Sequence, residues 1–146
     1  MNLLSEILSN RTITVPVFSW FLAQLIKVFN VVIIERKLDF TRFVGSGGMP
    51  SSHSSFIVCL ATVVGKSQGF DSVEFGITLA FAFIVMYDAA GVRRAAGKQA
   101  KVLNRLIFSS NNKESIDEKL KELIGHTPFE VFMGAILGIM IGFWFG

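Results

Sequence analysis

The stretch PFEVFMGAILGIMIGFWF, residues 128–145, contains one charged side chain, Glu130, and otherwise only apolar residues and glycine. A helix that crosses a bilayer needs about 20 mostly apolar residues, each adding about 1.5 Å to its length. This stretch therefore predicts a membrane-spanning helix that begins near Pro128 and ends near Phe145.

Three earlier stretches have the same character: about Thr14 to Ile34, about Ser52 to Val64, and about Val73 to Gly91. The first of them carries one interior charge, Lys27. The second is shorter than a bilayer crossing needs, so we expect it to tilt, to continue as a helix into Lys66, or to lie partly in the interface. The pattern predicts an all-α polytopic membrane helix bundle with about four transmembrane helices, forming a single domain over residues 1–146.

The composition agrees with a membrane protein. Of the 146 residues 51% are hydrophobic, 15 are Phe and only 17% are charged, and the mean hydropathy is +0.55. A water-soluble domain of this size seldom has such a composition. Residues 1–11 lack a basic start and a small-residue cleavage pattern, so we expect no removable signal peptide. Cys59, the only cysteine, is expected to act as a small hydrophobe within the second apolar stretch.

The basic residues are distributed unevenly between the two sides that four spans would create. The segments 35–51 and 92–127 hold eleven of them, whereas the other side holds only Arg11 and Lys66. The eleven are Arg36, Lys37, Arg42, Arg93, Arg94, Lys98, Lys101, Arg105, Lys113, Lys119 and Lys121. The positive-inside rule places this side in the cytoplasm and both termini outside. Since the basic residues lie between spans and no nucleic-acid motif is present, we expect lipid head groups as partners and no nucleic acid.

The long cytoplasmic connection has local signals of its own. Asn111 and Asn112 indicate a turn, and Ser115 with Glu118 forms a possible capping box. They predict a short amphipathic helix that ends at about Ile124, with Ile116, Leu120 and Leu123 on its apolar face.

A cluster of glycine, serine and histidine, GSGGMPSSHSS at residues 45–55, precedes the second apolar stretch. Gly47 and Gly48 let the backbone approach a ligand closely, and Pro50 is suited to the start of a helix. Free amides at Ser51, Ser52 and His53 would point at an anion. The alternative is an ordinary turn whose serines cap a helix.

A second cluster, YDAAGVRR at residues 87–94, ends the third apolar stretch and is followed by Lys98. Arginine offers a planar fork of donors that suits phosphate oxygens, and Asp88 needs a partner near the membrane. Arg93 and Arg94 are the candidates for both roles. The alternative is a stop-transfer cluster that only fixes the topology.

A third cluster, GHTPFE at residues 125–130, begins the last span. Glu130 follows His126 by four residues, so one helical turn can bring its carboxylate to the imidazole. A carboxylate on one ring nitrogen fixes the tautomer and leaves the other nitrogen able to attack phosphorus. The alternative is an interfacial histidine paired with glutamate for solubility.

The topology places all three clusters at one cytoplasmic level. The chain contains two histidines, His53 and His126, and each lies where a helix enters the membrane from that side. Two helix N-termini and a set of arginines then converge, which favours an anionic substrate.

The chain resembles the type 2 phosphatidic acid phosphatase and vanadium haloperoxidase superfamily, whose motifs are P-S-G-H and S-R-x5-H-x3-D. Residues 50–53, PSSH, are similar to the first motif, with Ser52 in place of glycine. Residues 126–130, HTPFE, are similar to the end of the second, with Glu130 in place of aspartate. The serine and arginine of that motif fall at Lys119 and Leu120, and no K-x6-R-P motif is present. The whole chain resembles the divergent bacterial and plant branch of the superfamily.

The resemblance implies a role for each cluster. His126 would be the nucleophile that forms a phosphohistidine, Glu130 would orient it, and His53 would protonate the leaving alkoxide. No metal or cofactor would be needed. The residues expected to bind phosphate are Ser51, Ser52, Arg93, Arg94, Lys37, Arg42 and Lys98. The residues expected to support them are Gly47, Gly48, Tyr87 and Asp88. The usual core of the family has six helices, so four helices imply a minimal bundle or a homo-oligomer in a bacterial cytoplasmic membrane.

These observations lead to two hypotheses of different classes. The first is a metal-independent phosphatase that hydrolyses a lipid phosphate monoester such as a polyprenyl phosphate or phosphatidate. The second is a non-catalytic binder or transporter of phosphorylated lipids, which the missing motif arginine favours. A vanadate-dependent peroxidase is a distant third, because such members of the superfamily are generally soluble.

Overall fold

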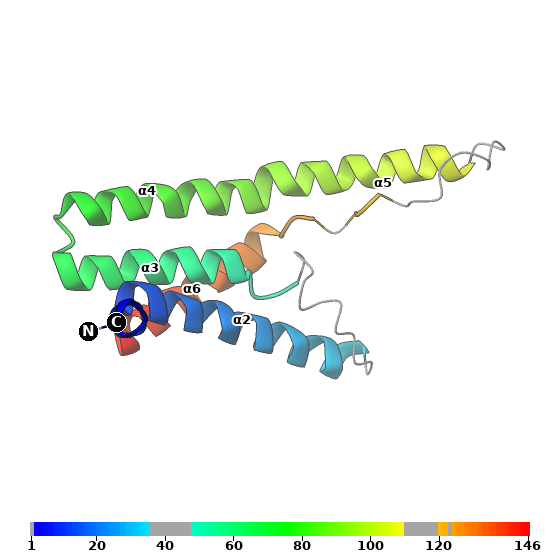
Figure 1. Cartoon of the computed structure of the whole chain (residues 1–146). Helices are drawn as coiled ribbons and strands as arrows, with labels where there is room; N and C mark the ends of the chain where they lie inside the picture. Colours follow the sequence, from blue (N-terminus) through cyan, green and yellow to red (C-terminus); the bar gives the residue numbers. More distant parts are fainter. Residues whose placement is uncertain (1, 36–47, 110–119, 123) are drawn as a thin grey trace.

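The computed structural model describes residues 2–35, 48–109, 120–122 and 124–146 (Figure 1). This part of the chain contains α-helices, one π-helical turn and no β-strand, which confirms the all-α prediction. The helices are α1 (Leu3–Ser9), α2 (Arg11–Glu35), α3 (Ser52–Gln68), α4 (Val73–Tyr87), α5 (Arg93–Ser109) and α6 (Pro128–Phe145), and the π-helical turn η2 (Asp88–Val92) joins α4 to α5.

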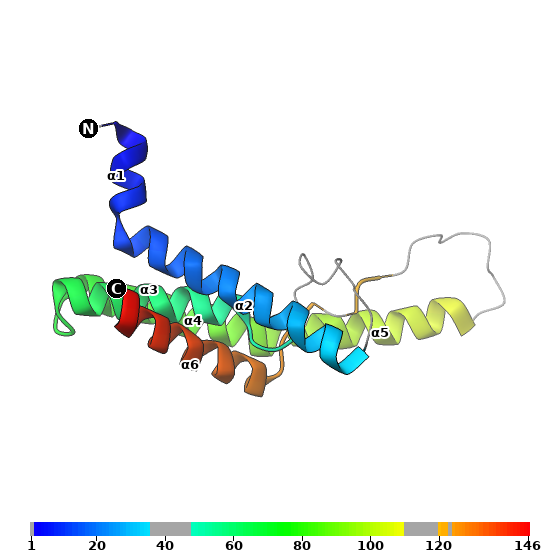
Figure 2. The ribbon, with the colours of Figure 1, turned by 90° about the horizontal axis from the view of Figure 1, so that it is seen from below.

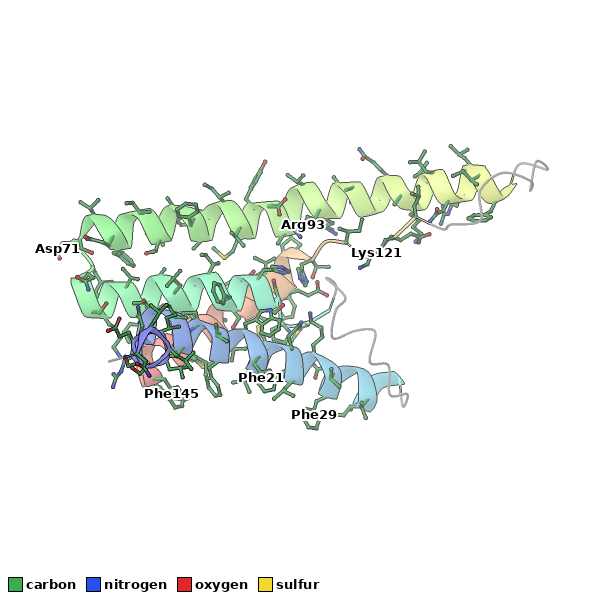
Figure 3. The ribbon with its side chains drawn as sticks, in the orientation of Figure 1. Phe21, Phe29, Asp71, Arg93, Lys121 and Phe145 are labelled. Carbon is green, nitrogen blue, oxygen red and sulfur yellow. The ribbon has the colours of Figure 1, made fainter. Side chains whose placement is uncertain are left out.

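The helix α3 lies at the centre of the bundle, with α2, α4 and α6 packed around it (Figures 1 and 2). The buried core joins Val15 of α2 and Ile141 of α6 to Cys59 and Val63 of α3. Cys59 is fully buried in this core, as expected for a small apolar residue. The large apolar side chains that point outward, including Phe21, Phe29 and Phe145 (Figure 3), suit a lipid surface.

Three glycines at four-residue spacing bring α6 close to α3. A Cβ atom added at Gly134 would collide with the Ser51 carbonyl oxygen, and one added at Gly142 would lie 2.7 Å from Thr62 Cβ. Gly138 faces the backbone of α3 between these two points. Small residues at such spacing allow helix backbones to approach closely within membranes. The packing holds the beginnings of α3 and α6 at one end of the bundle.

The helix that begins with α4 is longer than the sequence suggested. The span expected to end near Gly91 continues through η2 into α5, so that residues 73–108 form one helical rod of 36 residues. At about 1.5 Å per residue this rod is about 54 Å long, which exceeds the full thickness of a bilayer, about 40–45 Å. The basic helix α5 therefore extends beyond the bundle (Figure 1).

Within the described part of the chain, three helical segments are long and apolar enough to cross a membrane: residues 11–30, 73–108 and 128–145. The helix α3 has 17 residues and is not among them. It continues past Lys66 to Gln68, which agrees with the expected continuation of this helix into Lys66. The expectation of four spans stays a prediction.

The two ends of the bundle differ in chemistry. Arg11 and Lys66 both donate hydrogen bonds to the carbonyl oxygen of Gly146, so they lie together where α2 begins and α6 ends. The opposite end holds the beginnings of α3 and α6 together with η2.

The predicted helix that ends at about Ile124 is wrong at its C-terminal end. Residues 120–122 and 124 have no helical structure. The residues Asn111, Asn112, Ser115, Ile116, Glu118 and Leu123 lie outside the described part of the chain. Leu120 forms backbone hydrogen bonds with the side chain of Asn104 on α5, and this tertiary contact replaces the helical hydrogen bonds that the local pattern suggested.

Candidate functional site

Two histidines from segments far apart in the sequence meet at the end of the bundle beside η2. The ring centroids of His53 and His126 are 6.3 Å apart, with an angle of 61° between the ring planes. His53 is the second residue of α3, and His126 lies two residues before α6. Arg93, which begins α5 and is labelled in Figure 3, lines one small cavity together with both histidines. The three predicted clusters therefore converge, as the topology required.

A capping box orients the His126 ring. Glu130 accepts a hydrogen bond from the Thr127 amide at 2.8 Å, and the Thr127 hydroxyl accepts one from the Glu130 amide. The same Glu130 oxygen, Oε2, lies 3.3 Å from His126 Nδ1. With the proton on Nδ1 donated to this carboxylate, Nε2 carries the lone pair. The Nε2 atom is buried and has no hydrogen-bond partner within the described residues.

The π-helical turn provides the backbone partner of His126. In a regular α-helix the Arg93 amide would donate to the carbonyl of Ala89, four residues earlier. Here it donates to the carbonyl of Asp88, and the Ala89 carbonyl accepts a hydrogen bond from the His126 amide at 3.0 Å. Such π-turns within α-helices occur frequently at functional sites. The irregularity in the helix is thus tied directly to the position of His126.

The segment that leads to His126 is docked along α5. The buried amide of Asn104 donates to the Leu120 carbonyl and to Glu122 Oε1, each at 2.9 Å, and its oxygen accepts from the Leu120 amide at 3.0 Å. Gly125 lies so close to the helix that an added Cβ atom would collide with the backbone of Arg94. These contacts hold Leu120, Glu122 and Gly125 against α5, and they fix the path of the chain toward His126.

Ser51, two residues before His53, has a structural role at the start of α3. Ser51 is fully buried, and its hydroxyl caps α3 by accepting from the Ser54 amide. Its own amide donates to the Glu130 carbonyl at 3.0 Å, so the expectation of a free amide at Ser51 is wrong. Ser52 is also buried, with 2% of its surface exposed. Ser51 therefore joins the start of α3 to the start of α6, which stabilises the spacing of the two histidines.

Lys27 is a charged residue of the site that the sequence clusters did not include. It lies on α2 with 2% of its surface exposed, and a Cβ atom added at Gly48 would be 3.2 Å from its Cγ. Its charge interacts with His53, His126 and Glu130. The available signal was an ionisable residue inside an apolar span, which usually indicates function.

Arg93 closes the site on the side of η2. It forms an ion pair with Asp88 through its Nε atom, as predicted for that carboxylate, and 46% of its side chain is exposed. A cavity of about 20 Å³ lies between His53, His126 and this ion pair. Such a volume is about that required by one water molecule. The space is smaller than a phosphoryl group, and Arg93 and His53 are exposed residues of its wall.

The other predicted residues lie farther from the histidines or outside the description. Arg94 contacts Gly125 through its backbone, while the side chains of Arg94 and Lys98 are exposed. Tyr87 is 75% exposed and does not line the cavity. The predicted residues outside the described part of the chain are Lys37, Arg42 and Gly47.

The electrostatic environment favours a neutral His126. Burial lowers the pKa of His126 from its ordinary value; the Glu130 carboxylate opposes this shift, and the positive charge of Lys27 adds to it. An imidazole with a lowered pKa keeps its lone pair at neutral pH, as a nucleophile requires. Among the described residues no group of three or more His, Cys, Asp or Glu side chains is arranged to hold a metal ion.

Comparison with known proteins agrees with these observations. The family model described as "Divergent PAP2 family" matches residues 8–141. The chain is 40% identical over 148 aligned residues to a protein of Bacillus subtilis (strain 168) named "Uncharacterized membrane protein YuiD", and the alignment covers 93% of this chain and 94% of the relative. No solved structure matches the chain significantly.

Proposed function

This chain belongs to the divergent PAP2 family of phosphatase-related membrane proteins, and from that premise we propose that it hydrolyses a lipid phosphate monoester through a phosphohistidine at His126. The observation that carries the proposal is the state of the His126 ring. Its Nδ1 faces the Glu130 carboxylate, and its Nε2 is buried beside His53 without a hydrogen-bond partner in the described residues. A buried acceptor without a hydrogen-bond partner destabilises the folded protein, so its presence at this position favours a functional role.

In the first chemical step, His126 Nε2 attacks the phosphorus atom and the bond from phosphorus to the lipid oxygen breaks. His53, whose pKa is lowered by burial and by the charges of Arg93 and Lys27, acts in its protonated form and gives its proton to the leaving oxygen, so the lipid departs as an alcohol. The His126 ring becomes positively charged when its second nitrogen is phosphorylated. The Glu130 carboxylate stabilises this charge through the proton on Nδ1.

In the second step, water attacks the phosphorus atom and the bond to Nε2 breaks. Neutral His53 now accepts the proton of the water, and inorganic phosphate leaves. Each histidine returns to its starting protonation state. Arg93 in the cavity wall and Lys27, whose charge acts on both histidines, would stabilise the phosphoryl oxygens in both transition states.

The position of the site supports a lipid as the substrate. His53 lies at the beginning of α3 and His126 lies just before α6, whose outward face carries exposed apolar side chains such as Phe129 and Phe132. A phosphate held at this level stays attached to a chain that remains in the bilayer. The proposed chemistry is possible on either side of the membrane. The distribution of basic residues between the loops favours the cytoplasmic side.

The test is phosphate release from a panel of lipid monophosphates by the purified protein in detergent with EDTA present. We expect His126→Ala to lower the rate by at least about 10³-fold and His53→Ala to lower it substantially. Lys101→Ala is the control, because this exposed cation on α5 does not line the cavity. Acid-quenched enzyme should carry an acid-labile phosphate on His126. Turnover by His126→Ala at the wild-type rate would refute the mechanism.

A second candidate function is a non-catalytic binder or transporter of phosphorylated lipids. Two observations favour it: Leu120 lies where the superfamily has an arginine and is held by Asn104, and the cavity at Nε2 is only about 20 Å³. A folded protein that binds the panel lipids without releasing phosphate would support this candidate. In that case Arg93→Ala should weaken binding more than His126→Ala does.

A further inference from the structure

A second cavity lies beside the histidine site, between three helices. Its volume is about 410 Å³, within the usual range of about 300–1,000 Å³ for small-molecule sites. Its walls are Val17 and Trp20 from α2, His53, Phe56 and Ile57 from α3, and Val85 from α4. We call this space the apolar groove. Among the described residues that line it, the indole N–H of Trp20 is the only polar side-chain group apart from His53.

The apolar groove adjoins the small cavity at His126. His53 and Val85 line both spaces. Phe56 and Ile57 follow His53 by three and four residues on α3, so all three lie on one face of that helix. A molecule whose leaving oxygen is protonated by His53 would therefore pass directly from the polar site onto aromatic and aliphatic side chains.

The groove also has access from the bilayer. Val17 is 49% exposed and Trp20 is 41% exposed, and both lie on the segment 11–30 that is long and apolar enough to cross the membrane. A hydrocarbon chain could enter sideways between helices without leaving an apolar environment. Burial of such a chain in the groove is favourable, at about 25 cal/mol per Å² of apolar surface.

We propose that the apolar groove binds the hydrocarbon chain of the substrate, and that the substrate is a single-chain alkyl or prenyl monophosphate whose chain begins at the leaving oxygen. This inference rests on the proposed function and names its substrate class. A diacylglycerol phosphate places ester carbonyls within a few atoms of the leaving oxygen. Beyond His53, the described lining residues offer carbonyl oxygens there no side-chain donor except Trp20, and buried polar groups without partners are costly.

A selectivity assay tests the chain position. The variant Ile57→Trp fills the groove, and Ile139→Trp makes the same change at a residue of α6 that is 43% exposed and does not line it. The measured quantity is the ratio of kcat/KM for dodecyl phosphate to kcat/KM for butyl phosphate. We expect Ile57→Trp to lower this ratio at least 10-fold and Ile139→Trp to leave it unchanged. An unchanged ratio in a folded Ile57→Trp protein overturns the proposal.

The same assay compares substrates that have one hydrocarbon chain with substrates that have two. Wild-type protein should have a kcat/KM at least 10-fold higher for a prenyl monophosphate than for a dioleoyl phosphatidate in the same detergent. Equal values overturn the single-chain assignment.

A binding experiment separates failure of the inference from failure of the proposed function. Wild-type protein is irradiated with a dodecyl phosphate that carries a diazirine in its chain, and the labelled peptides are identified by mass spectrometry. Label concentrated on residues 17–20 and 56–57 supports the groove, even if no phosphate is released and the phosphatase function fails. Label spread evenly over the outward faces of α4 and α6 overturns the groove, even if hydrolysis occurs.

Discussion

The backbone amide of His126 donates a hydrogen bond to the carbonyl oxygen of Ala89, with the two atoms 3.0 Å apart. Ala89 belongs to the π-helical turn that separates α4 from α5, where the Arg93 amide bonds to Asp88 instead. One local change in a helix therefore provides a backbone acceptor for the residue proposed as the nucleophile. The same turn places Arg93 and Asp88 at the wall of the cavity.

Gly125→Ala should displace His126. The added Cβ would collide with the backbone of Arg94, and overpacking of this kind costs about 1–3 kcal/mol. We expect a lower melting temperature and a fall in phosphate release of at least about 10-fold. Gly76→Ala is the matched control, since nothing lies within 4 Å of its added Cβ. Wild-type activity in Gly125→Ala would contradict the close approach seen here.

Glu130→Gln should separate orientation of the imidazole from capping of α6. Glutamine cannot supply the negative charge that stabilises a phosphorylated imidazolium, so kcat should fall by about 10²–10⁴-fold. Thr127→Ala removes the cap of the same helix and should cost about 1 kcal/mol of stability with a much smaller change in kcat. Steady-state kinetics and thermal unfolding of both variants provide the comparison. Equal effects on kcat would show that the carboxylate only caps the helix.

The pH dependence of His126 follows from the direction of its shift. Its pKa is lowered in the folded protein, so between that value and about 6.5 the unfolded chain binds a proton that the folded chain does not. The contribution of His126 to stability is complete above about pH 6.5 and is lost as the pH falls below it. Nitrogen-15 NMR of the histidine side chains, assigned with His53→Gln, should give a pKa for His126 below about 6.5. A value above that would refute a neutral buried nucleophile.

Lys27→Met should raise the pKa of His126 toward its ordinary value, because the positive charge of Lys27 contributes to the lowering. The loss of a cation at the phosphoryl site should also lower kcat/KM by about 10²–10³-fold. Arg11→Met removes a charge from the opposite end of the same helix and serves as the control. The pKa of His126, measured by NMR titration, and the rate of phosphate release should both change in Lys27→Met. An unchanged pKa for His126 would separate Lys27 from the site.

Asn104→Ala should undock the segment that leads to His126. Three hydrogen bonds of its amide group hold Leu120 and Glu122, and a buried polar group left without its partner costs about 1–3 kcal/mol. We expect faster proteolytic cleavage of this segment and a lower kcat. Gln99→Ala, an exposed neighbour on α5, should change neither. Slow cleavage together with normal kcat in Asn104→Ala would show that other contacts hold the segment.

Local pattern and composition determined the helical class and the approximate helices. The apolar run 128–145 coincides with α6, because apolar periodicity and capping residues act over a few neighbouring positions. The PSSH and HTPFE motifs, which are equally short, identified both histidines. The capping box at Thr127 and the pair of Asp88 with Arg93 are equally local, since their partners lie within five residues along the chain.

Only the tertiary structure decided how distant segments complete the site. The continuation of α4 into α5, the use of Ser51 as a tie to Glu130, and the burial of Lys27 beside both histidines depend on contacts between helices. No local pattern encodes such contacts, because their free energy comes from close packing and from hydrogen bonds that form only when the helices meet. The nonhelical course of Leu120 arises in the same way, through hydrogen bonds to Asn104, sixteen residues earlier.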